Sequence, residues 1–155
     1  MRVLEPWLAE PLDELVRESN ARLALIMTSS GQVIGQHGFT RSLDVMAAAA
    51  LGSGILATTA ELARVVGSDG EFGAVVHRGQ RHGVWLAGFD TPRGRWVALV
   101  VFGRHSTTGL VRLFFERFAN RVRDVAPTPT STREVLAEGF ERELDASLRA
   151  LFGSN

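Results

Sequence analysis

Residues 106–125 read STTGLVRLFFERFANRVRDV and directly follow the apolar run WVALVVF at 96–102. Ser106, Thr107 or Thr108 can cap the N-terminus of a helix, because a side-chain hydroxyl accepts a hydrogen bond from a free backbone N–H group. Apolar residues then recur at helical spacing and form one stripe: Leu110, Leu113, Phe114, Phe118, Val122 and Val125. We therefore predict a strand that leads into an amphipathic helix, which docks through its apolar stripe.

Upstream of this junction, four more apolar runs predict strands. Residues 22–28 and 33–37 are separated by Ser, Gly and Gln residues and form a predicted hairpin. Residues 71–78 and 81–89 meet at a Gly-Gln turn and form a second hairpin. With residues 96–102, the chain has five predicted strands.

Helical spacing of apolar residues predicts two more core helices, at residues 7–19 and 43–66. The second spans more than six turns, with Ser42 as a plausible N-cap and the sequence GSDG at 67–70 as its stop. The order is helix, two strands, long helix, three strands, helix. It predicts an α+β fold with α/β/α layers, in which a five-stranded, mostly antiparallel sheet carries the long helix on one face and two helices on the other.

Residues 1–125 form this predicted domain, and a Pro/Thr-rich linker follows at residues 126–132. Alternating prolines favour extended backbone, so the linker is expected to be semi-rigid. Residues 133–155 are predicted to form a C-terminal amphipathic helix, which a Ser-x-x-Glu capping box precedes. Its narrow apolar stripe consists of Leu136, Phe140, Leu144, Leu148, Leu151 and Phe152. The stripe needs a surface to dock on. That surface belongs to its own domain, to a second copy of the chain or to a partner protein.

The composition excludes several kinds of chemistry. All 17 basic residues are Arg, so a P-loop lysine and a Schiff-base lysine are both excluded. The chain has no Cys, which excludes thiolate chemistry and suits a reducing compartment. Acidic residues interrupt residues 1–15, unlike in a signal peptide, and the uncharged run 45–60 is too short and too small in its side chains for a membrane span. We expect a cytoplasmic protein with no membrane span.

Charge is distributed unevenly although the net charge is zero. Residues 71–125 carry nine Arg against four acidic residues, and both ends of the chain are acidic. Nucleic-acid binding would place basic and aromatic side chains on one shared surface. Here the basic residues lie largely at hairpin turns and on a helix whose aromatic residues fit its buried stripe. The pattern argues against a nucleic-acid partner, and attraction between the acidic tail and the basic middle explains it equally well.

No arrangement of residues indicates a reaction centre. The sequence GSG at 52–54 lacks the spacing of a nucleophile elbow and falls inside a predicted helix. His77 and His82 face each other across a hairpin turn, but two imidazoles are fewer ligands than a metal site normally uses. His37 and His105 lie in predicted loops. We assign no catalytic residue, metal or cofactor, and we expect no small-molecule substrate because no convergent polar set indicates a pocket.

The long helix has two apolar faces. One stripe suits packing on the sheet: Leu43, Ala47, Leu51, Ile55, Thr58, Leu62, Val65 and Val66. The neighbouring flank is small and scarcely polar, whereas a solvated flank should carry charges. This flank supplies the candidate partner-binding residues: Met46, Ala49, Ala50, Ser53, Ala57 and Ala60. Small side chains let another backbone approach closely, which serves either a partner or the same helix of a second copy.

Several local motifs agree with a known family in their order and spacing. They are SGQVI at 30–34, the Ala-rich helix 43–66 that closes on Gly67, Phe72 leading into VVHRG at 75–79, and GLVR at 109–112. Across residues 8–125 the chain resembles the roadblock/dynein light chain family. It is most similar to the bacterial MglB-type members, which act on a Ras-like GTPase of the MglA type.

The resemblance implies a homodimer that joins two edge strands into one continuous sheet, with the long helices side by side. Residues 71–78 would be the joining edge, with Phe72, Ala74, Val76 and Arg78 at the dimer interface. An exposed edge strand and an uncharged helix flank are both liabilities in a monomer, so the dimer also has physical support.

The resemblance further implies a non-enzymatic regulator of an MglA-type GTPase, in cell polarity or motility signalling. The paired long helices would be the platform, which acts by positioning the catalytic groups of the GTPase. An inserted arginine, from Arg41, Arg104 or Arg112, is less favoured because any 17 arginines supply candidates. The alternative is a scaffold or adaptor with no effect on nucleotide turnover.

Overall fold

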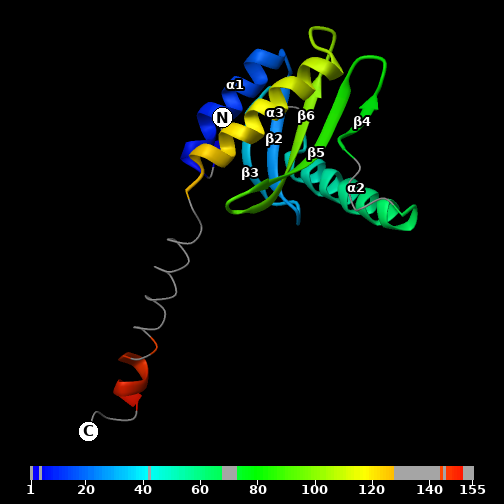
Figure 1. Cartoon of the computed structure of the whole chain (residues 1–155). Coiled ribbons are helices and arrows are strands. Elements are labelled where there is room, and N and C mark those ends of the chain that lie inside the picture. Colours follow the sequence, from blue (N-terminus) through cyan, green and yellow to red (C-terminus); the bar gives the residue numbers. More distant parts are fainter. Residues whose placement is uncertain are drawn as a thin grey trace.

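The computed structural model describes residues 2–3, 5–41, 43–67, 73–127, 144 and 146–151. Within these residues, one antiparallel sheet has six strands in the order β1-β3-β2-β6-β5-β4 (Figure 1). The strands are β1 (Arg2–Val3), β2 (Leu23–Thr28), β3 (Val33–Gly38), β4 (Val75–Arg78), β5 (Gly83–Thr91) and β6 (Gly94–Phe102). The five predicted strands are present, and β1 is a two-residue strand that pairs with β3. The predicted α+β fold is confirmed.

Helices cover both faces of the sheet. They are η1 (Pro6–Leu8), α1 (Ala9–Ser19), α2 (Val45–Val65) and α3 (Thr108–Val125). Figure 1 shows α1 and α3 on one face and α2 on the other, as the element order predicted. Asp44 caps α2, because its Oδ1 accepts a hydrogen bond from Ala47 N at 3.0 Å, whereas the predicted cap Ser42 lies outside the described residues. Thr107 caps α3 and accepts a hydrogen bond from Leu110 N at 3.1 Å.

The core between the sheet and the α1–α3 layer is rich in aromatic rings. Phe89 of β5 contacts both Phe115 and Phe118 of α3, with ring centroids 5.7 Å apart in each pair. Trp7 stacks on Trp96 of β6 at 5.8 Å. Such pairs add directional contacts to the burial of large apolar area, so this layer anchors both helices firmly to the sheet.

The predicted stripe of α3 is displaced from the observed one. The buried residues are Val111, Phe115, Phe118, Ala119 and Val122, whereas Leu113 and Val125 of the predicted stripe are exposed. The buried face of α3 is shifted because the helix packs against two neighbours at once, the sheet and α1. Arg121 of α3 pairs with Glu14 of α1, and its Nη2 lies 3.2 Å from Glu10 Oε1.

The core beneath α2 is thinner and brings the helix close to the sheet. It contains Leu25, Met27, Leu86, Val97 and Leu99 from the strands. A Cβ atom on Gly52 of α2 would lie 3.1 Å from both Leu86 Cδ2 and Met27 Cε. Glycine at this position therefore permits the close approach of helix and sheet.

Most of the C-terminal region lies outside the described residues. This includes residues 128–132 of the predicted linker and residues 133–143 of the predicted C-terminal helix. Residues 144 and 146–151 are helical, and Leu144, Leu148 and Leu151 on this helix are exposed. The domain helix α3 ends at Val125.

Candidate functional site

The outward side of α2 carries large apolar side chains that nothing in the described chain covers. Met46 is 82% exposed, Leu51 68% and Val65 81%. We call the line of residues opposite the sheet the outer stripe of α2: Leu51, Ile55, Leu62 and Val65. Large contiguous apolar patches on a folded domain mark interaction sites. The outer stripe is therefore the first candidate for a protein-binding surface.

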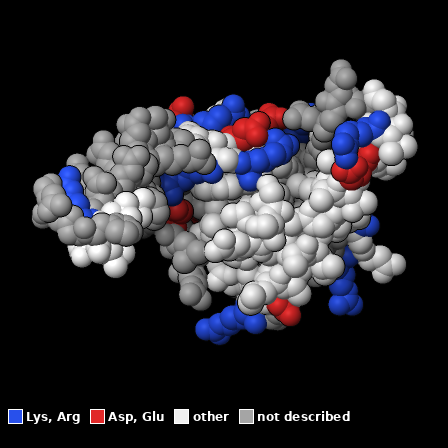
Figure 2. All heavy atoms as spheres, turned by 90° about the horizontal axis from the view of Figure 1, so that it is seen from below, with Lys and Arg blue, Asp and Glu red and all other residues white. Residues whose placement is uncertain are grey.

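Few charges interrupt this surface. Figure 2 views the molecule from the side on which α2 lies and shows a broad uncharged area, with charged side chains gathered at its margins. The two charged residues of α2 are Glu61 and Arg64, which form an ion pair with each other in its last turns. The hydrogen bond and the charge of Arg64 hold the pKa of Glu61 below its ordinary value. The pair therefore stays ionised at neutral pH and adds no net charge to the surface.

The structure corrects the predicted orientation of α2. Its buried residues are the small ones, Ala49, Gly52, Ser53 and Ala63. Most of the large apolar residues that were expected on the sheet are exposed instead, namely Leu51, Ile55, Leu62, Val65 and Val66, whereas Leu43 is half-buried against the core beneath α2. The reason is close packing at the middle of the helix, where a Cβ atom on Gly52 would lie 3.1 Å from Leu86 Cδ2 and Met27 Cε.

The correction divides the predicted partner-binding residues. Met46, Ala50, Ala57 and Ala60 are exposed and available to another chain. Ala49 is fully buried, and Ser53 is buried with its Oγ donating a hydrogen bond to Thr28 O at 3.4 Å. Ala49 and Ser53 therefore pack on their own sheet and contribute no contact area to a partner.

The strand β4 lies at the edge of the sheet, where a joining edge was predicted. It pairs with β5 in the register Val75↔Leu86 to Arg78↔Gly83, and within the described residues its outer side has no strand neighbour. Of the predicted interface, Val76 is half-buried and Arg78 exposed in β4, Ala74 is half-buried just before it, and Phe72 lies outside the described residues. The unpaired N–H and C=O groups of such an edge can pair with another strand.

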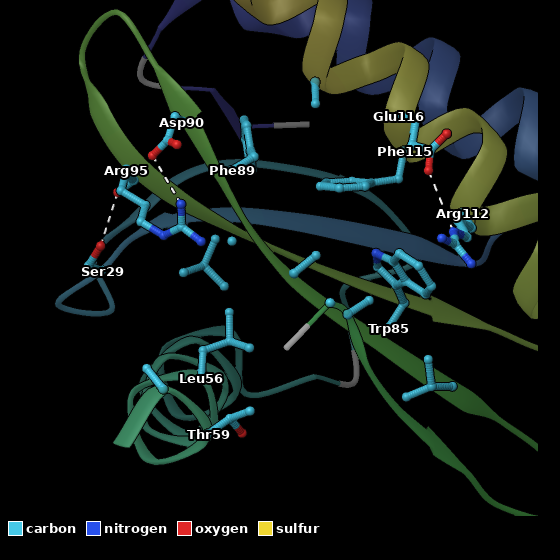
Figure 3. Close-up of a pocket in the computed structure, with 18 of the residues that line it drawn as sticks. Ser29, Leu56, Thr59, Trp85, Phe89, Asp90, Arg95, Arg112, Phe115 and Glu116 are labelled. Carbon is cyan, nitrogen blue, oxygen red and sulfur yellow. Dashed lines mark hydrogen bonds and ion pairs between the residues drawn. The ribbon is translucent and has the colours of Figure 1, made fainter. Parts of the chain in front are cut away.

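A groove of about 1210 Å³ lies beyond the end of β4, between α2 and α3 and against β5 (Figure 3). Ala57 and Ala60 of α2 line one side of it, which shows that this flank of α2 faces the same edge of the sheet as β4. Trp85 and Phe115 line it on the α3 side. The groove is open and is lined by residues from both faces of the sheet.

Four of the five charged side chains that line the groove form two ion pairs, and the fifth, Arg123, donates from its Nε to Ala119 O. Arg95 Nη1 lies 3.0 Å from Asp90 Oδ1, and Arg112 Nε lies 3.5 Å from Glu116 Oε1. This pairing leaves little free charge to orient a small substrate. Arg112, one of the arginine-finger candidates, is thus held by a carboxylate, whereas Arg41 and Arg104 are exposed outside the groove.

The histidines do not converge with other ligands. His77 and His82 are exposed at the β4–β5 hairpin, and His37 Nε2 lies 3.1 Å from Asp13 Oδ1. Among the described residues, no group of three or more His, Asp or Glu side chains is placed to hold a metal ion.

By length and composition alone, α2 is apolar enough to cross a membrane. A helix that packs on protein passes the same test. The small face of α2 is packed on the sheet, and a second apolar face opposite to it suits contact with another protein chain. Packing thus favours a protein-binding helix.

Comparisons with known proteins agree with this description. Residues 8–91, more than half of the chain, match the family model of the Roadblock/LC7 domain. The structure is similar to MglB of Myxococcus xanthus, with a TM-score of 0.68 and 24% identity over 76% of this chain and 93% of that one. It is also similar to the gliding protein MglB of Thermus thermophilus, with a TM-score of 0.69 and 25% identity over 81% of this chain and 93% of that one.

A third similar structure is the Roadblock/LC7 domain from Streptomyces avermitilis, with a TM-score of 0.62 and 20% identity over 74% of this chain and 93% of that one. The sequence comparison with curated proteins finds no match. The family-model match over residues 8–91 leads to one conclusion. The chain belongs to the Roadblock/LC7 domain family.

Proposed function

We propose that this chain is a homodimeric, non-catalytic regulator of a Ras-like, MglA-type small GTPase. The observation that carries the proposal is the exposed outer stripe of α2 in a domain whose nearby sheet edge is unpaired within the described residues. The similarity to MglB proteins supplies the class of partner. A cytoplasmic location and a role in cell polarity or motility signalling follow from the same similarity.

The geometry of the dimer follows from β4. A second copy that pairs through the outer side of β4 extends the sheet and brings its α2 toward the first α2. The flank that meets it is the one that faces the β4 edge, which includes Ala57 and Ala60. Small side chains allow the two helix backbones to approach closely, so these alanines are assigned to the dimer interface.

This assignment leaves the outer stripe for the GTPase. Leu51, Ile55, Leu62 and Val65 lie opposite the sheet and not on the flank toward β4. In the dimer, two outer stripes run side by side and form one apolar platform. A partner that buries them gains about 1.5 to 3 kcal/mol for each large side chain removed from water. Regulation then works by positioning the catalytic groups of the GTPase.

Light scattering at micromolar concentration is expected to give about twice the 16.9 kDa mass of the chain. Pairing of β4 edges satisfies the backbone groups on both edges, and helix packing buries apolar surface at the same time. A mass that stays at the monomer value across the concentration range would contradict the proposed dimer.

GTP hydrolysis by an MglA-type protein is expected to rise when this chain is added. The measurement is phosphate release at a fixed GTPase concentration, with and without the chain. The chain alone should release no phosphate, because it has no lysine for a P-loop. Binding without any change in turnover would instead identify a scaffold or adaptor, the alternative function of the same surface.

A further inference from the structure

The α3 side of the groove is a strip of sheet that no described helix covers. The residues of α3 that border it are Thr108, Arg112, Phe115, Glu116, Ala119, Asn120 and Arg123. Because α1 packs on the opposite side of α3, this stripe of α3 has no helical neighbour among the described residues. Ala74 and Val76, at the edge of the sheet below it, are only half-buried. There is thus room for one more helix in this layer.

Two buried polar groups in the groove are unsatisfied. Trp85 is 5% exposed, and within the described residues neither its Nε1 nor Thr108 Oγ1 has a hydrogen-bond partner. Both residues line the groove, and Figure 3 shows the Trp85 ring beneath the part of α3 that carries Arg112 and Phe115. Buried polar atoms normally have partners, so the packing of Trp85 and Thr108 on this side of the groove is incomplete within the described residues.

The C-terminal segment of the same chain is long enough to reach the groove. Its starting point is close, because Arg123 near the end of α3 lines the groove. Seven residues such as 126–132 span about 20 Å when extended at roughly 3.1 Å per residue, which exceeds the distance of about 8 to 10 Å between packed helices. A helix over residues 133–151 would be about 28 Å long, close to the length of about 27 Å for α3.

The chemistry of the segment also matches the groove. Residues 133–151 carry five acidic residues and three Arg, and on the groove side of α3 Arg123 has no carboxylate partner within the described residues, whereas Arg112 is paired with Glu116. If the segment forms a helix that runs antiparallel to α3, the first turns of that helix lie beside Arg123 and its last turns lie beside Arg112 and Thr108. The segment has an apolar stripe to lay on the sheet, and in its described part Leu148 and Leu151 are exposed.

We propose that residues 133–151 dock as a helix on the α3 side of the groove, antiparallel to α3 and over the α3 face of β4 and β5, away from Ala57 and Ala60 of α2. The docked helix becomes the third helix of the α1–α3 layer and covers Trp85. The outer side of β4 and the outer stripe of α2 both remain accessible. The proposal therefore does not depend on the proposed function.

Cross-linking in the full-length chain tests this placement directly. The chain has no Cys, so two introduced cysteines provide the only thiols. Asn120→Cys is exposed and lines the groove, whereas Arg117→Cys is exposed on the α1 side of the same helix, where it borders Glu14. Each is combined with Ala137→Cys and treated with a short bismaleimide.

The Asn120→Cys pair is expected to form an intramolecular cross-link at least tenfold faster than the Arg117→Cys pair. Adding Leu148→Glu should reduce its rate to that of the control, because a carboxylate cannot replace the apolar contact. Equal rates for the two pairs would overturn the proposal. Cross-links found only between two chains would also overturn it, and would instead place the segment in the groove of a second copy.

Discussion

Replacing Ala49 by arginine is expected to destabilise the fold by about 3 to 5 kcal/mol, a large part of the usual stability of a domain. Ala49 is fully buried between α2 and the thin core of the sheet. An arginine there introduces an unpaired buried charge and a side chain for which there is no space. Urea denaturation followed by circular dichroism measures the change.

Ala50→Arg is the matched control, because the neighbouring alanine is exposed on the same turn of α2. Its effect on the free energy of unfolding should stay within about 0.5 kcal/mol, as is usual for surface substitutions. A similar loss for both variants would show that α2 does not rest on the sheet in the orientation described. The pair thus tests the correction to the predicted orientation of the helix.

The double substitution Leu51→Arg and Leu62→Arg is expected to weaken GTPase binding more than 100-fold while the dimer persists. Both side chains are exposed and lie on the outer stripe. Each loses about 1.5 to 3 kcal/mol of apolar burial, and each new charge must be desolvated at the interface. Titration of a labelled MglA-type GTPase gives the Kd, and light scattering of the same sample reports the oligomeric state.

Ala57→Arg provides the complementary variant, because Ala57 lies on the flank toward the β4 edge. This substitution should break the dimer. It should weaken GTPase binding only indirectly, because a monomer presents one outer stripe where the dimer presents two. If the outer-stripe variant lost the dimer and Ala57→Arg kept it, the two surfaces would have to exchange roles. Unchanged binding in the outer-stripe variant would remove the platform from α2 altogether.

Local patterns were sufficient to predict the fold. Apolar runs bounded by Gly and polar turns located the strands, and the capping residue Thr107 was among the three predicted for α3. The exclusion of lysine and cysteine chemistry follows from composition, which folding does not change. These properties depend on neighbours in sequence, so the sequence carries them directly.

The orientation of α2 was not predictable in the same way. Leu51 and Ala49 are two residues apart and both apolar, so helical periodicity allows either face to lie on the sheet. The structure buries Ala49 because the strands beneath it leave a narrow space, and Leu51 is consequently turned outward. The predicted stripe of α3 was displaced for a related reason, since α3 packs on α1 as well as on the sheet.

The sequence by itself determined the element order, the family resemblance and the absence of lysine and cysteine. Only the tertiary structure decided which face of α2 is exposed, which part of the predicted partner-binding set is accessible, and where the groove lies beside β5. The physical reason is that burial depends on the distance between packed layers. That distance is set by residues far apart in the sequence, such as Gly52, which has no side chain, and Met27 and Leu86, whose side chains lie against it.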